Sequence, residues 1–72
     1  MTPFEFILTT LQTAADRADS VNQPAATRKQ VFYLAKLIDG AGEAQEAAEE
    51  YCTRTDYLLT KREASNWIET YV

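Results

Sequence analysis

The sequence predicts an all-α fold, a small four-helix bundle (three to four helices) that forms one domain over residues 1–72. Along several segments, apolar residues recur three and four positions apart, which is the period of an amphipathic helix. Three threonines each stand three positions before a Glu or Gln, the spacing of the capping box that begins many helices. The helix-interrupting residues are confined to Pro3, Pro24, Gly40 and Gly42, so long helical segments remain between them.

The first helix is predicted from Thr2 to about Ser20. Thr2 and Glu5 have capping-box spacing, and Pro3 occupies the first helical position, where its missing N–H costs nothing. One face of this helix is apolar and consists of Phe4, Ile7, Leu8, Leu11, Ala14, Ala15, Ala18 and Val21. Phe6 lies outside that face, so it either fills a seam between elements or anchors a partner, since aromatic residues are enriched in interface cores.

The second helix, residues 27–39, is expected to be the central one. Thr27 and Gln30 form a second capping box, and Gly40 stands where a left-handed residue often ends a helix. Its apolar arc is wider than the roughly 100° stripe of an ordinary surface helix, so we expect it to pack against several others. Phe32 lies outside the arc and raises the same two alternatives, seam filler or partner anchor.

The third helix, residues 43–52, has an alanine-rich face and an acidic face. The acidic face consists of Glu43, Glu46, Glu49 and Glu50. These charges are either a solvated face or, with Asp39, an acidic strip that complements a basic partner surface. Glutamates fanned over one helical face do not converge as calcium ligands do, so we expect no metal site. Cys52, at the end of this helix, is expected to be a small core residue.

The last helix is predicted to begin at Thr60, which forms a third capping box with Glu63. Residues 53–59 before it are expected to form a loop whose apolar side chains plug one end of the core. Together the apolar faces predict a core of Phe4, Ile7, Leu8, Leu11, Val31, Leu34, Leu37, Ile38, Tyr51, Trp67, Ile68 and Tyr71.

Positive charges follow two of the predicted N-caps, at Arg28 and Lys29 and again at Lys61 and Arg62. A cation there opposes the helix dipole and costs about 0.3–1 kcal/mol when exposed. Two helix starts with free N–H groups and added cations would form an anion site, most simply for phosphate, if they lay side by side. Alternatively, these cations pair with the glutamates of the third helix or with their own capping carboxylates.

Composition argues against several classes of function. Seven basic and eleven acidic residues give a net charge of −4, which disfavours general nucleic-acid binding through a basic surface. The chain has no histidine and no glycine-rich phosphate loop, so we expect neither an enzyme nor a cofactor. Its single cysteine allows no internal disulfide, and no apolar run approaches the roughly 20 residues of a membrane span. With no signal peptide expected either, the sequence predicts a soluble cytoplasmic protein that does not engage a membrane.

Two signatures resemble a known family: Thr27-x-Lys29-Gln30-x-x-Tyr33-Leu34-x-x-Leu37 and Leu59-Thr60-Lys61-x-Glu63-Ala64-Ser65-x-x-Ile68. They are similar to a small helical module of uncharacterised function in short phage and prophage reading frames, which is also appended to some phage DNA-metabolism proteins. The resemblance covers residues 27–70, mostly at cap and core positions. The chain departs from the module by the acidic helix between the signatures and by the helix that precedes them. The resemblance implies a mobile-element origin and a binding or adaptor role, and it transfers no catalytic residue.

We therefore expect a non-enzymatic protein-binding adaptor or inhibitor, encoded by a phage and acting on a host protein in host takeover or counter-defence. Its surface would be the acidic strip, with Phe6 or Phe32 as anchor, and its partner would be a protein with a basic surface. The alternative is an accessory module that contacts nucleic acid or phosphate through the four basic residues at the helix starts. The sequence leaves open whether the chain forms a homodimer.

Overall fold

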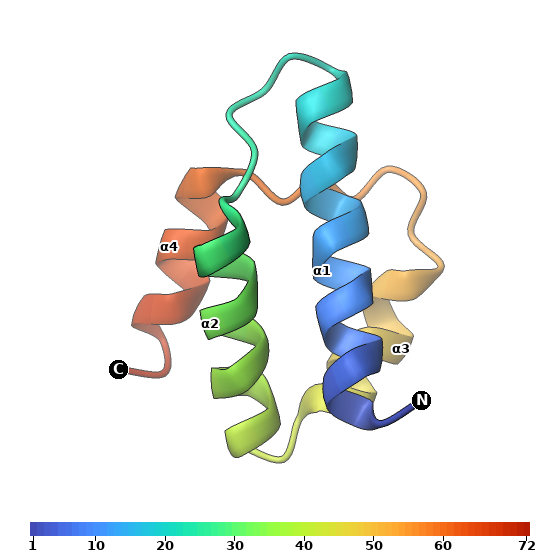
Figure 1. Ribbon diagram of the computed structural model, residues 1–72, viewed down its shortest axis with the longest axis vertical. Helices are drawn as coiled ribbons and strands as arrows, with labels where there is room; N and C mark the ends of the chain where they lie inside the picture. Colours follow the sequence, from blue (N-terminus) through green and yellow to red (C-terminus); the bar gives the residue numbers. More distant parts are fainter.

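The computed structural model describes all 72 residues and contains four α-helices. They are α1 (Pro3–Ser20), α2 (Arg28–Gly40), α3 (Ala44–Cys52) and α4 (Lys61–Glu69), and they run alternately up and down (Figure 1). The predicted all-α class is confirmed, because the rest of the chain is turns, loops and one isolated β-bridge. None of the four helices is both long and apolar enough to cross a membrane.

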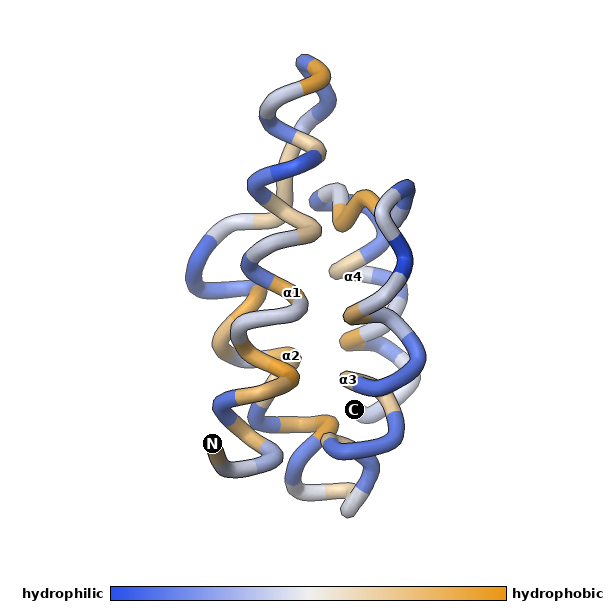
Figure 2. Tube along the Cα trace, turned by 90° about the vertical axis from the view of Figure 1, so that its right-hand side faces the viewer, coloured by the Kyte–Doolittle hydropathy of each residue, from blue (hydrophilic) through white to orange (hydrophobic).

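The helices form two layers, with α1 and α2 in one and α3 and α4 in the other (Figure 2). Between the layers, α3 packs against both α1 and α2, whereas α4 packs against α2 alone. The backbones of α3 and α4 do not pack against each other. The second helix therefore contacts all three others, which confirms its predicted central place.

Two of the three predicted capping boxes are complete. At the start of α1, the Glu5 N–H donates to Thr2 Oγ1 (3.2 Å), and the Glu5 carboxylate accepts from the Thr2 N–H (3.3 Å). At the start of α4, the Glu63 N–H donates to Thr60 Oγ1 (3.2 Å), but the Glu63 carboxylate accepts no bond in return. The third box is thus half formed, and other contacts, described below, hold the start of α4.

The end of α2 differs from the prediction. Gly40 is the last residue of the helix, and the left-handed residue is Gly42, with φ 75°. The Glu43 N–H donates to the Ile38 carbonyl (3.0 Å) and the Gly42 N–H to the Asp39 carbonyl (2.9 Å), the bonding of a Schellman-type helix end. The prediction was two residues early because either glycine can adopt a positive φ, and the hydrophobic period does not choose between them.

The core lies between the two layers. Its largest fully buried side chains are Ile7, Leu11, Val31, Leu34, Ile38 and Leu59. Five of them were in the predicted core, and Leu59 comes from the loop that was expected to plug one end. The other predicted core residues are half-buried, and alanines of α1, α3 and α4 occupy the closest approaches between helices. Cys52, expected in the core, is exposed, because the last fully buried residue of α3 is Ala48, one turn earlier.

Candidate interaction surfaces

Three of the four predicted glutamates border a groove between α3 and α4. This acidic groove has a volume of about 230 Å³. We define it by Glu43, Glu46, Glu50, Tyr51, Trp67 and Tyr71. Its rim is exposed carboxylate and its floor is half-buried aromatic, so charge and apolar surface occur together. The fourth predicted glutamate, Glu49, lies outside the groove, where it accepts a hydrogen bond from Gln45 Nε2 (2.7 Å).

The aromatic floor joins the two helices of this layer. The rings of Tyr51 and Trp67 lie 5.5 Å apart between centroids, and Tyr57 stacks on Tyr51 at 4.5 Å. Tyr71 donates a hydrogen bond from its hydroxyl to Glu43 Oε1 (2.7 Å). Burial, and then this hydrogen bond, raise the pKa of Tyr71 above its usual value, so the hydroxyl keeps its proton and remains a donor. The floor is therefore held by side chains where the backbones do not meet.

The two phenylalanines that lie outside the predicted apolar arcs have different surroundings. Phe6 is half-buried against the core in the seam between α1 and α3, beside Tyr51 and Cys52. Phe32 is 47% exposed on α2, in the layer opposite α3. The structure therefore does not bring Phe32 together with the acidic strip, and it places Phe6 in a seam, which is the non-anchor alternative.

The N-termini of α2 and α4 lie side by side (Figure 1). An antiparallel bridge between Ala25 and Thr60 joins the segments that precede the two helices. In it, the Ala26 N–H donates to the Leu59 carbonyl (3.0 Å) and the Lys61 N–H donates to the Pro24 carbonyl (2.8 Å). The condition that the sequence analysis set for an anion site, two adjacent helix starts, is met.

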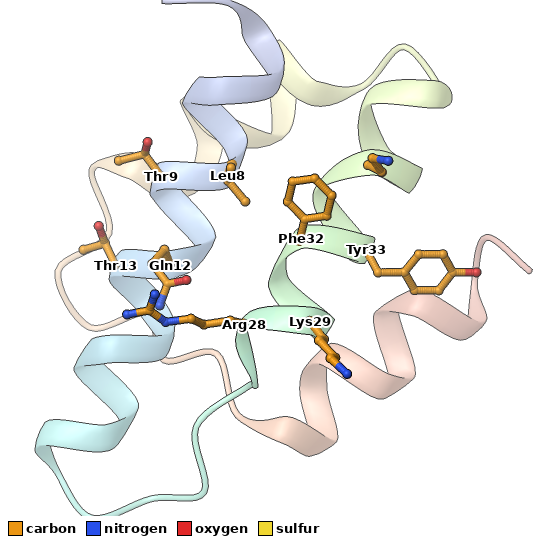
Figure 3. Close-up of a pocket in the computed structure, with 9 residues that line it drawn as sticks. Leu8, Thr9, Gln12, Thr13, Arg28, Lys29, Phe32 and Tyr33 are labelled. Carbon is orange, nitrogen blue, oxygen red and sulfur yellow. The ribbon is translucent and has the colours of Figure 1, made fainter.

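The four cations at these helix starts are exposed but do not all converge. Arg28 extends toward α1, beside Gln12 and Thr13, whereas Lys29 points to the α4 side of α2 (Figure 3). Lys61 and Arg62 are the first two residues of α4. We call Lys29, Lys61 and Arg62 the basic edge. The backbone N–H of Lys61 is not available to an anion there, because it donates to the Pro24 carbonyl. The hydrogen bonds of Glu43 and Glu49 stay within the α3–α4 layer.

A larger groove, absent from the sequence analysis, runs between α1 and α2. Its volume is about 770 Å³. The groove is lined by Leu8, Thr9, Gln12 and Thr13 of α1 and by Arg28, Lys29, Phe32, Tyr33 and Lys36 of α2 (Figure 3). A sequence signal for it existed, since the α2 residues fall at i, i+1, i+4, i+5 and i+8, one stripe opposite the buried arc. What the sequence lacked was the knowledge that no other helix covers this stripe.

Comparisons of the chain with family models, with curated proteins and with solved structures each found no match. The resemblance of residues 27–70 to the phage module therefore stays a prediction. Three surfaces of the molecule are candidate binding sites: the acidic groove, the basic edge and the α1–α2 groove.

Proposed function

We propose that this protein is a small non-enzymatic binding module, an adaptor or inhibitor, that binds a basic surface of another protein through the acidic groove. The observation that supports this most is the meeting of three exposed glutamates with a preformed aromatic floor. Complementary charge steers association and fixes orientation, and aromatic side chains supply buried area at low entropic cost. A carboxylate rim alone would be an ordinary solvated face.

Binding is favoured over catalysis because nothing near the groove is arranged for proton transfer or nucleophilic attack. A catalytic site needs a nucleophile or base with an orienting partner. The chain has no histidine, and the Cys52 thiol lies 3.7 Å from a backbone carbonyl, that of Glu49, and not beside a base. The narrower role, a phage-encoded protein acting on a host protein in host takeover or counter-defence, rests on the resemblance of residues 27–70.

The test is affinity capture from a lysate of the natural host, with and without nuclease, read by mass spectrometry. The test variant is Glu43→Gln, Glu46→Gln and Glu50→Gln, which removes charge but keeps an acceptor for Tyr71. A matched control removes three exposed carboxylates elsewhere: Asp19→Asn, Glu49→Gln and Asp56→Asn. We expect one host protein to be captured with and without nuclease by the wild type and the control, and lost by the test variant. Equal capture by both variants would refute the acidic groove as the binding site.

A second candidate function is contact with nucleic acid or another phosphate ligand through the basic edge. The Ala25–Thr60 bridge favours it, since it holds two capped helix starts next to each other. Titration with inorganic phosphate and with a short duplex at several salt concentrations tests it, using Lys29→Gln, Lys61→Gln and Arg62→Gln. Under this candidate, affinity falls steeply with salt and the substitutions flatten that dependence. A salt-independent interaction, or one that the substitutions leave unchanged, rules it out.

A further inference from the structure

The outer face of α2 exposes aromatic surface that the fold does not use. The large apolar side chains that are exposed are Met1, Val21, Phe32, Tyr33 and Val72. Three of these lie at the ends of the chain or directly after α1, where exposure is ordinary. Phe32 and Tyr33 lie inside a helix and are 47% and 48% exposed. Contiguous apolar surface with a polar rim is typical of an interaction site.

The α1–α2 groove gives this surface a shape. Its walls are two antiparallel helices of 18 and 13 residues, so the depression follows a helix axis (Figure 1). Phe32 points into it toward Leu8 (Figure 3). The Phe32 ring is held by an edge contact with Phe4, at 5.7 Å between centroids and 90°. The apolar centre is therefore positioned before any partner arrives, which lowers the entropic cost of binding.

The charge of the groove is opposite in sign to the net charge of the molecule. Three of its nine lining residues are cations, Arg28, Lys29 and Lys36, and none is a carboxylate, in a protein of net charge −4. Lys36 Nζ lies 5.0 Å from the centroid of the Phe32 ring, so charge and aromatic surface are adjacent. A ligand that fits must therefore carry negative charge around an apolar anchor.

We propose that the α1–α2 groove is a second docking site, which binds an acidic amphipathic helix of a partner protein. Such a helix would lay a Leu or aromatic side chain against Phe32 and Leu8 and direct flanking carboxylates to Arg28 and Lys36. This goes beyond the proposed function, which uses the opposite layer and a basic partner. The molecule would then join two partners of opposite charge.

Two other occupants fit less well. A nucleic acid could follow the cations of the groove onto the basic edge, but its backbone has no apolar group to place against Leu8 and Phe32. A second copy of this chain would have to offer its acidic helix, α3. The apolar side of that helix, at Ala44 and Ala48, is already fully buried.

The probe is a display library of peptides of about 18 residues, long enough for a helix to form in a groove, randomised on a helix-forming background. It is selected on the immobilised protein. The groove variant is Arg28→Gln and Lys36→Gln. The matched control removes two cations elsewhere, Lys61→Gln and Arg62→Gln. We expect enriched peptides to carry Asp and Glu around an apolar i, i+4 pair. Their affinity should fall about tenfold or more in the groove variant and stay close to wild type in the control.

Backbone amide shifts on titration of the best peptide locate the site, and we expect them along the α1–α2 groove. Gln12→Trp, which fills the groove without changing charge, should abolish binding while the far-UV circular dichroism stays unchanged. Failure of acidic amphipathic peptides to enrich over blank support, or equal binding of them by the groove variant, would overturn the proposal. So would tighter binding of an oligothymidylate, or sedimentation showing a dimer that Gln12→Trp dissociates. None of these results bears on Glu43, Glu46 or Glu50, so the proposed function stands or fails separately.

Discussion

The two layers of this bundle are built on different principles. The α1–α2 layer supplies large fully buried side chains, with Ile7 and Leu11 from one helix and Leu34 and Ile38 among those from the other. The α3–α4 layer supplies only alanines to the fully buried set, and its aromatic residues are half-buried. The first layer also has complete capping boxes, whereas α3 has no side-chain cap and α4 has half a box.

This difference indicates that the α1–α2 layer supplies most of the stability, whereas the α3–α4 layer carries the proposed binding surface. The helices of the second layer have nine residues each, shorter than a length at which helices persist alone in water, so they depend on docking. Alanines allow that close approach, and the aromatic side chains close the space that remains. A layer that contributes little to the core can vary its outer surface freely, and the acidic groove is on that layer.

The largest expected effect is in the first layer. Leu34→Ala removes a fully buried side chain from the central helix and should cost about 2–5 kcal/mol, a large share of the stability of so small a domain. Trp67→Ala, in the second layer, removes a larger but half-buried side chain and should cost less. Urea unfolding followed by circular dichroism measures both. The contrast between the layers would be wrong if Trp67→Ala proved the more damaging.

Adding volume inside the second layer tests how tightly α3 is docked on the rest of the bundle. Ala48 is fully buried on α3, so Ala48→Leu should overpack the core around it and cost about 1–3 kcal/mol. The matched change Gln45→Leu places the same side chain on the exposed face of α3 and should be nearly neutral. Thermal unfolding of the two variants decides, and a tolerated Ala48→Leu would mean that the second layer is loosely docked.

Alkaline pH should loosen the second layer through Tyr57. Burial, and then the nearby Tyr51, raise the pKa of Tyr57 above its usual 10.0. The folded state thus holds a proton that the unfolded chain releases, so stability is complete below pH 10 and falls as the pH rises further, by no more than about 1.4 kcal/mol per pH unit. Urea unfolding between about pH 8 and 11, from about two units below the usual tyrosine pKa to about one unit above it, tests this. Tyr57→Phe should flatten the slope, and an unchanged slope would contradict the assignment.

The connection between the layers gives the smallest and sharpest test. Gly42 has φ 75°, so Gly42→Ala forces a side chain into the left-handed region and should cost about 1 kcal/mol. Gly40 is helical with open space where a Cβ would lie, so Gly40→Ala should stabilise by about 0.5–1 kcal/mol. Each shift corresponds to about 4–8 °C in Tm per kcal/mol for a domain of this size. Shifts of the same sign would show that the helix end is misplaced.

How far the sequence predicts this structure depends on whether a feature is local. Capping spacing and the helical period are local, and they located all four helices. The pairing of Ala25 with Thr60 joins distant segments and follows from docking, so the sequence could only state it as a condition. Phe6 and Phe32 show the same limit. Both lie outside their apolar arcs, yet α1 packs against helices on two sides and half-buries Phe6, while no further helix packs over Phe32, which is 47% exposed.

The Ala25–Thr60 bridge ties the start of α4 to the segment that precedes α2. The amide hydrogens of Ala26 and Lys61 each bond to a carbonyl across it, so neither can exchange with deuterium until the bridge opens. The backbone of α4 packs against α2 alone, and only side chains join α4 to α3, so its release leaves the packing of α1 on α2 and α3 intact. Those two amides should therefore exchange as a pair and earlier than the amides of Leu34 and Ile38. We therefore expect the bridge to open, and α4 to be released, while the rest of the protein stays folded.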